Sequence, residues 1–195
     1  MPVLSHKYRL YPTQAQAAGM EAMLGAFCDL YNAALQQRIE AYRRRRKTLR
    51  YADQAGELKA VRAADERLAG YSFSAEQQVL RRLDKAFQAF FRRLTTQGKA
   101  GFPRFQVKAR FDSAEVRVGD GLTIRKSKRL RVVGIPGEVK VTWHRPLPSG
   151  AKLGAAGGEP ILPRCCRSPR RLIAPMPPGG PIRPRRRPAG DVMRS

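Results

Sequence analysis

The segment that most constrains the fold is a strand-like stretch at the start of the chain with no strand-like neighbour nearby in the sequence. Apolar and polar positions alternate over residues 3–10 (VLSHKYRL), which is the period of a half-buried strand. One face of this stretch carries Leu4, His6, Tyr8 and Leu10. The next alternating stretch begins only at residue 114. Because an isolated strand is unstable in water, we expect residues 3–10 to pair with the later strands across a helical insertion.

A long amphipathic helix is predicted directly after that first strand. Pro12 ends the strand, and Thr13 and Gln16 have the spacing of a capping box. The residues that follow at spacings of three or four form one apolar face, which comprises Met20, Leu24, Phe27, Tyr31 and Leu35. We expect this helix to continue through Tyr42 into the five cations at 43–47.

A second long helix and a weaker one are predicted further along the insertion. Ser74 and Gln77 repeat the capping-box spacing ahead of another apolar stripe. That stripe comprises Val79, Leu83, Phe87, Phe90, Phe91 and Leu94. A weaker helical segment over 53–69 ends at Gly70, and its apolar positions are Leu58, Val61 and Leu68.

Short strands are predicted in the next part of the chain. The period falls towards two in four stretches, at 114–118, 122–124, 130–135 and 138–143. Short strands divided by Gly and Pro favour a small barrel or sheet. The predicted fold class is therefore α+β, a small split β-barrel with an inserted helical bundle, followed by a disordered basic tail.

The chain changes character at about residue 154. Residues 155–195 are rich in Arg and Pro, and Pro or Gly interrupts every candidate element there. We therefore expect that tail to be disordered.

The charge of the chain points to an anionic partner. Lys and Arg number 39 against 15 Asp and Glu, which gives a formal net charge of +24. Such an excess is most readily neutralised by a phosphate backbone. We find no apolar run of about 18 residues and no basic-then-apolar leader, so we expect a cytoplasmic, nucleoid-associated protein without a membrane partner. The three cysteines do not have zinc-site spacing, and Cys28 falls on the apolar stripe of the first helix.

The acids and histidines do not suggest a catalytic centre. Asp112, Glu115 and Asp120 cluster loosely in a turn-rich, basic stretch, which is a weak basis for a divalent metal site. His6 and His144 have no Cys or Ser context that suggests nucleophilic catalysis. Phosphate-binding glycine motifs are absent from the sequence. We expect no catalytic residue, no metal and no cofactor.

Cations interleaved with aromatic residues are the more informative pattern, because cations bind phosphates and rings stack on bases. Four places combine them: Lys7 to Arg9 around Tyr8, Tyr42 before Arg43–Lys47, Phe102 and Phe105 around Arg104, and Trp143 before His144 and Arg145. Lys108 and Arg110 lie near the third. Tyr8, Phe102, Phe105 and Trp143 are equally compatible with a packing role.

Five ordered blocks resemble the N-terminal half of the OrfB/TnpB family of transposon-associated RNA-guided nucleases. The blocks are YRLYPT at 8–13, LGAFCDLYNAALQQR at 24–38, QQVLRRLDKAFQAFFRR at 77–93, GFPRFQVK at 101–108 and VKVTWHRPLP at 139–148. The resemblance implies that residues 1–12, as the first strand, and residues 98–154, as the remainder, form the wedge-like split β-barrel of that family. It implies that residues 13–97 form the inserted helical recognition bundle. It also implies binding of a transposon-end guide RNA and a target DNA, including a short motif that flanks the target.

The resemblance and the basic patterns together give the candidate nucleic-acid contacts. Gln77 and Gln78 start the second long helix, where an amide can read an adenine edge or simply cap the helix. The resemblance makes them candidates for contact with the flanking motif, and the cations of the matching blocks candidates for backbone contact. The full candidate set is Lys7, Arg9, Arg43, Arg44, Arg45, Arg46, Lys47, Gln77, Gln78, Arg81, Arg82, Lys85, Arg104, Lys108 and Arg145.

The resemblance stops at about residue 154. The family's RuvC-like nuclease half, with three separated carboxylates and a zinc element, would follow there, and residues 155–195 carry neither feature. We therefore expect a truncated transposase-family protein that binds DNA or RNA and does not cleave it. Two alternatives remain open: a stand-alone RNA-binding or ribosome-associated basic protein, and a nuclease-dead DNA-binding repressor.

Overall fold

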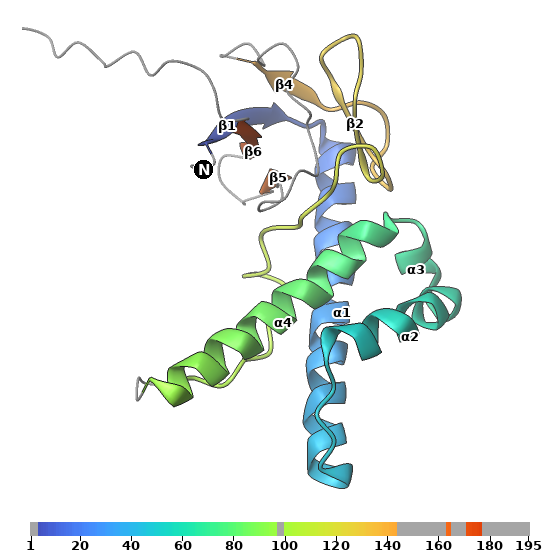
Figure 1. The fold of residues 1–195 in the computed structure, drawn as a ribbon. Helices are drawn as coiled ribbons and strands as arrows, with labels where there is room; N and C mark the ends of the chain where they lie inside the picture. The colour runs from blue at the N-terminus through green and yellow to red at the C-terminus, as the bar shows by residue number, and fades with distance from the viewer. Residues whose placement is uncertain (1–3, 97–99, 144–162, 165–170, 177–195) are drawn as a thin grey trace, which may run out of the picture.

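Two crossing helices and a small sheet at one end of the longer helix form the frame of the molecule (Figure 1). The computed structural model describes residues 4–96, 100–143, 163–164 and 171–176. The helices are α1 (Gln14–Arg45), α2 (Tyr51–Ala64), α3 (Glu66–Ala69) and α4 (Phe73–Thr95). The strands are β1 (Leu4–Tyr11), β2 (Leu122–Ile124), β3 (Leu130–Val132), β4 (Lys140–Thr142), β5 (Pro163–Arg164) and β6 (Arg171–Met176). No helix in the described ranges is both long enough and apolar enough to cross a bilayer.

Helix α1 confirms the first predicted helix. Thr13 and Gln16 form the predicted capping box, in which the backbone nitrogen of Gln16 donates to the Thr13 hydroxyl at 3.3 Å. All five residues of the predicted stripe are buried, and so is Cys28. The helix ends within the cation run, because Arg46 adopts the left-handed conformation with φ 53°. The remaining two cations are Arg46, which caps the helix, and Lys47, which lies beyond it.

The second half of the insertion differs from the prediction in three places. The predicted weak helix is two helices, α2 and α3, separated at Asp65, and Val61 is 40% exposed rather than packed. The cap of α4 is Ser72, whose hydroxyl accepts from the Ala75 amide, so the predicted Ser74 start was wrong. The stripe of α4 is buried at Val79 and Leu83 only, and the side chains near its C-terminal end emerge from the core.

A buried arginine joins the three longer helices. Arg38 of α1 is 7% exposed, and its Nε donates to Oε1 of Gln54 in α2 at 2.8 Å. Its terminal nitrogens lie 3.1 and 3.2 Å from Oδ1 of Asp84 in α4. The same guanidinium lies over the Phe87 ring, 5.0 Å from its centroid. Each of the three guanidinium nitrogens of Arg38 has a hydrogen-bond partner. Its burial therefore fixes where α2 and α4 cross α1.

The sheet confirms that the first strand pairs across the insertion. β1 pairs antiparallel with β4, with Arg9 opposite Thr142 and Leu10 opposite Val141. Tyr8 and Leu10 of β1 are buried and Arg9 is exposed, as the alternation predicted. The chain is therefore a β module divided by helices.

The described strands do not close a barrel, so the barrel prediction is not confirmed. They form one sheet in the order β4-β1-β6-β5 and a separate hairpin, β2-β3. Only an isolated bridge between Leu130 and Val139 links the hairpin towards β4. Strands of three residues offer too few ladder hydrogen bonds to continue around a closed barrel.

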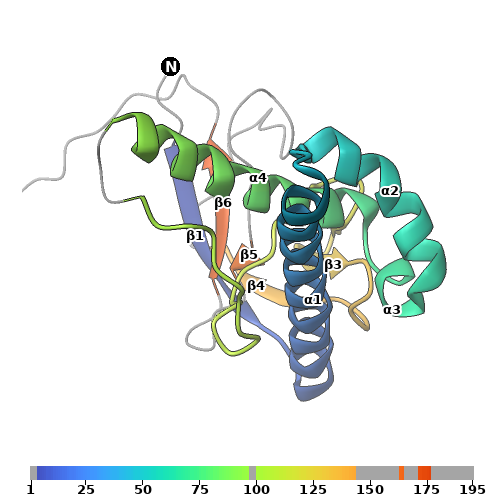
Figure 2. The ribbon, with the colours of Figure 1, turned by 90° about the horizontal axis from the view of Figure 1, so that it is seen from below.

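The prediction that the whole tail is disordered was wrong for its described part. β6 pairs antiparallel with β1 along six residues, with Lys7 opposite Ile173, and β5 pairs with β6 (Figures 1 and 2). The free side of β1 offers unpaired backbone N–H and C=O groups, which favour addition of a strand. Leu172 to Ala174 is an apolar run free of Pro and Gly, and it supplies that strand.

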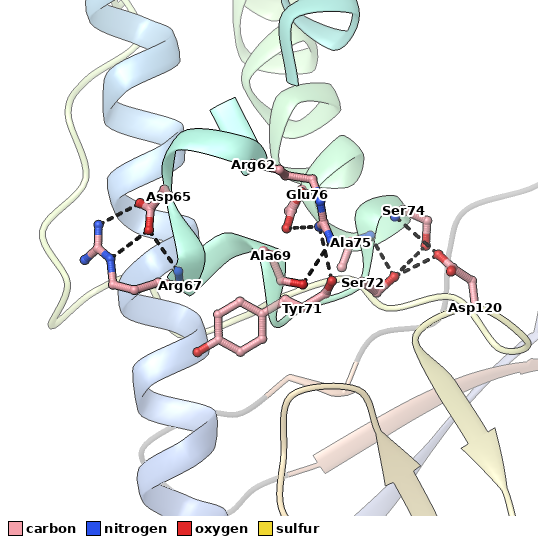
Figure 3. Close-up of polar contacts among 10 residues, drawn as sticks. All are labelled: Arg62, Asp65, Arg67, Ala69, Tyr71, Ser72, Ser74, Ala75, Glu76 and Asp120. Carbon is pink, nitrogen blue, oxygen red and sulfur yellow. Dashed lines mark hydrogen bonds and ion pairs between the residues drawn. The ribbon is translucent and has the colours of Figure 1, made fainter. Parts of the chain in front are cut away.

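A buried ion pair positions the start of α4 (Figure 3). Glu76 in the first turn of α4 is fully buried, and Arg62 of α2 donates a short hydrogen bond to its Oε1. Arg62 also donates to the backbone oxygens of Tyr71 and Ala69, each at 3.1 Å. Burial raises the pKa of the Glu76 carboxyl, and the hydrogen bond and positive charge of Arg62 act against that rise. One guanidinium thus holds α2, the turn after α3 and α4 together.

A second contact ties the start of α4 to the β module. Asp120, in the turn before β2, accepts from the Ser72 hydroxyl at 2.8 Å and from the Ser74 amide at 3.2 Å (Figure 3). Hydrogen bonds from Ser74 and Ser72 lower the pKa of Asp120. A carboxylate at a helix N-terminus is also stabilised by the helix dipole. The orientation of α4 is therefore set from both sides of its first turn.

Breaking the buried pair should destabilise the protein in a pH-dependent way. We expect Arg62→Met to cost about 3 kcal/mol at neutral pH, because it leaves the Glu76 carboxylate buried without a counter-charge. The loss of Arg62 raises the folded-state pKa of Glu76 further above the ordinary value of 4.5, so the deficit grows as the pH rises through that pKa and shrinks in acid. Chemical denaturation at several pH values measures this. Adding Glu76→Gln should remove the pH dependence of the deficit, and a deficit that stays constant with pH would contradict the assignment.

The Asp120 contact predicts the opposite dependence. Its folded-state pKa is lowered, so its stabilisation is present above the ordinary aspartate value of 3.8 and is lost as the pH falls. Asp120→Asn keeps a hydrogen-bond acceptor and removes the charge. We expect it to cost under about 1 kcal/mol at neutral pH and nothing in strong acid. Thermal unfolding compares it with Glu21→Gln, which removes an exposed charge from α1 and should have no such effect.

Candidate nucleic-acid interface

A basic pocket lies between α4 and the segment that leads from it into the β module. Its volume is about 250 Å³, and one wall is the first half of α4 and the other is residues 111–115. The polar and charged side chains of the α4 wall are Gln78, Arg81, Arg82 and Lys85. Four of the sequence candidates therefore come together in one place because they lie on successive turns of one helix face.

The cations of this pocket differ in how far they are already engaged. Arg82 lies 4.6 Å from the centroid of the Phe111 ring and donates to the backbone oxygen of Ser113 at 3.1 Å. Arg81 stacks over Tyr51 of α2 at 5.2 Å, and Lys85 is exposed. Within the described residues, neither Arg81 nor Lys85 has an ion pair. Both therefore have donors to offer to an anion.

The two glutamine candidates occupy different positions on α4. Gln77 is half-buried, whereas Gln78 is 7% exposed and lies in the pocket wall. In the amide orientation that satisfies both its groups, Gln78 donates to Oε1 of Glu115 at 3.2 Å and accepts from Arg117 at 3.0 Å. This network joins α4 to the segment before β2. Contact between Gln78 and a base would require that network to rearrange.

The cation run at the end of α1 forms a separate basic surface. Arg43 to Lys47 are all exposed and lie at the end of α1 remote from the sheets (Figure 1). Arg44 has a long contact of 4.0 Å to Glu40, and Arg46 lies over the Tyr42 ring at 5.5 Å. The exposed Arg44–Glu40 pair contributes little to stability at that distance, so most of the positive charge of the run is not neutralised by it.

The candidates around the sheet are only partly described. Arg9 is exposed on β1 and lies 5.3 Å from the centroid of the Tyr11 ring. Lys7 lies in β1, but its side chain is outside the described part of the structure, and Arg145 lies outside the described residues. Tyr8 is buried and its ring lies 4.8 Å from that of Trp143. These two rings pack against each other, in agreement with the packing role that the sequence had left open.

The candidates after α4 lie on an extended segment beside that helix. Arg104 is exposed, and Lys108 is exposed but forms an ion pair of 3.0 Å with Asp29 of α1. The backbone oxygen of Gln106, between them, accepts from Asn32 of α1 at 2.8 Å. Contacts with α1 therefore fix this segment, and they leave the guanidinium of Arg104 free to face outwards.

Sequence reasoning missed a third group of cations, in the turn of the β2–β3 hairpin and on the adjoining strand β3. Arg125, Lys126, Lys128, Arg129 and Arg131 are all exposed there. Only Arg125 has an ion pair in the described part of the chain, 3.4 Å from Glu138. The signal was present as RKSKRLR at 125–131, but it contains no aromatic residue and was passed over for that reason.

The three acids weighed as metal ligands do not converge. Asp120 accepts a hydrogen bond from Ser72 at the start of α4, and Glu115 faces Gln78. Across the described residues, no three or more His, Cys, Asp or Glu side chains gather where they could hold a metal ion. The thiol of Cys28 is buried, donates to the Gln106 backbone oxygen at 3.3 Å, and has its pKa raised by burial. It is a packing residue.

Comparison with known proteins relates this chain to a family model and to a longer protein. Residues 1–47 match the family model of the helix-turn-helix domain of IS605 OrfB proteins. In this structure the described part of that segment is β1 followed by one unbroken helix, α1. A Streptomyces pristinaespiralis protein named an RNA-guided DNA endonuclease is 28% identical over 148 residues, which cover 75% of this chain.

The match spans 35% of the length of that relative. The sequence blocks, the family model and the relative agree with one another, so the resemblance of this chain to the N-terminal part of OrfB/TnpB transposase-family proteins is confirmed.

Proposed function

We propose that this chain binds nucleic acid through α4, with phosphates held by Arg81 and Lys85 at the mouth of the basic pocket. The observation that carries the proposal is the pairing of a 250 Å³ pocket with two cations that have no ion pair among the described residues. Charge-assisted contacts to phosphate are strong when the donors are held in place beforehand. Here the ring of Tyr51 orients Arg81, and the contacts at Glu76 and Asp120 orient the helix.

The nucleic acids we propose are a guide RNA encoded at the end of an insertion sequence and the DNA that it pairs with. The name of the Streptomyces relative supports this assignment. The basic hairpin turn at 125–131 and the end of α1 add two surfaces for a large polyanion. Because α1 is unbroken, the docking geometry of a helix-turn-helix does not support the proposal, and α4 with its pocket supports it instead.

We further propose that the chain binds without cleaving. The scattering of the acids within the described ranges supports this, because metal-dependent phosphoryl transfer requires carboxylates that converge on a cation. Sequencing of crosslinked, copurified nucleic acid tests the whole proposal. Transposon-end RNA is the expected result, whereas enrichment of ribosomal RNA would indicate a ribosome-associated protein. Magnesium-dependent cleavage that is lost in Asp120→Ala would contradict the absence of catalysis.

Replacing one cation of the pocket should weaken binding more than replacing a cation elsewhere. Lys85→Gln removes a phosphate contact, so we expect weaker binding to all sequences and a salt dependence reduced by about one counterion. Lys59→Gln is the matched control, because Lys59 is also an exposed lysine on a helix. Fluorescence anisotropy between about 50 and 200 mM salt measures both. Equal effects of the two substitutions would rule out the pocket as the binding site.

Neutralising Arg43 to Lys47 together should weaken binding without changing sequence preference. These side chains are exposed and lie at the end of α1 remote from the sheets, so we expect them to supply charge and not base readout. Binding of a panel of oligonucleotides that differ only in sequence measures this. A changed order of preference within the panel would assign a base-reading role to the run.

A further inference from the structure

The C-terminal half of α4 carries an aromatic cluster that the core does not cover. Phe87, Phe90 and Phe91 come from α4, and Phe102 comes from the segment that runs back beside it (Figure 1). The Phe102 ring lies edge-on to Phe87 and Phe90, with centroids 5.5 and 5.4 Å away. Phe91 lies 5.3 Å from Phe90. We call these four residues the tip cluster.

The outer members of the tip cluster are accessible. Phe91 is 51% exposed and Phe102 is 47% exposed, while Phe87 and Phe90 are half-buried beneath them. Phe102 packs edge-on against the inner pair and Phe91 packs against it in a tilted arrangement, so both outer rings are held in place. A soluble protein gains nothing from leaving two fixed rings in water, so this surface has the properties of a docking site.

The charge around the cluster selects the chemistry of the occupant. The sequence has no acidic residue between Asp84 and Asp112, although it has seven cations there. Arg92 and Arg93 on α4 and Arg104 on the returning segment are exposed, and none has an ion pair in the described part of the chain. The surface is therefore one of rings bordered by unneutralised guanidinium groups, which attracts an anion with flat apolar groups.

We propose that the tip cluster is a stacking platform for unpaired bases of a single-stranded nucleic acid, with Arg92, Arg93 and Arg104 on its phosphates. A duplex hides its base faces, whereas a single strand offers a ring face and a charge at every nucleotide. The platform is distinct from the pocket, which lies along the first half of α4. The inference rests on the proposed nucleic-acid binding and names the form of nucleic acid that this end of α4 selects.

Leucine substitutions test the platform with little loss of apolar burial. In full-length Phe91→Leu/Phe102→Leu, we expect affinity for a short labelled oligothymidylate to fall by roughly tenfold, because stacking on two rings is lost. Affinity for a duplex of the same length should not change. Phe73→Leu is the matched control, since Phe73 is a 37% exposed ring at the other end of α4. Unchanged single-strand binding, or an equal loss on the duplex or in the control, would overturn the proposal.

A tryptophan substitution gives a second readout that does not depend on stability. Phe102→Trp keeps a ring for stacking, so single-strand affinity should be retained and the new fluorescence should be quenched on binding. Self-association that the leucine variant abolishes, with single-strand affinity unaffected, would identify a protein-docking surface and overturn the platform. Failure of the proposed function is distinguishable, because the wild-type chain would then bind neither single strands nor duplex.

Discussion

The three longer helices of this protein depend on the burial of one guanidinium. Arg38 enters the helix interface from α1 and finds a neutral acceptor on α2, a carboxylate on α4 and an aromatic face beneath it. A charge in that position is tolerated only while each partner remains, because an unpaired buried charge is costly. The interaction thus specifies one crossing arrangement where apolar packing alone would accept several. The pocket, the tip cluster and the cation run take their relative positions from it.

Polar contacts also fix the start of α4. The contacts of Arg62 with Glu76 and of Asp120 with Ser72 fix the first turn of α4 from the helical and the β side respectively. The pocket begins within the next turn, at Gln78. Binding residues on a helix fixed in this way lose little conformational entropy when a ligand arrives. These polar contacts account for the position of α4 better than its apolar stripe, in which only Val79 and Leu83 are buried.

How far the sequence predicted this structure depended on whether the deciding interaction was local. The stripe of α1 and its capping box were predicted correctly, because both follow from spacings within one helix. The cap of α4 was placed two residues late, since Ser72 is favoured by Asp120, far along the chain. Pairing of β1 with β4 was predicted from the instability of a lone strand, but the contribution of β6 was not, because the tail around it is rich in Pro and Gly. Of the five candidate site residues on α4, four lie together in the pocket and Gln77 does not, and the hairpin cations were missed.

The place of β1 in the middle of its sheet has a consequence for how the chain folds. β1 is synthesised first, yet its neighbours are β4 and β6, which leave the ribosome only after the whole helical insertion. The helices have local contacts and can form early, whereas the sheet closes a long loop and must form late. During synthesis β1 therefore has two open edges, and a strand in that state is prone to pair with other chains. The sheet of this protein can thus form only after β4 and β6 have been synthesised, and the helical part provides a fixed frame on which it assembles.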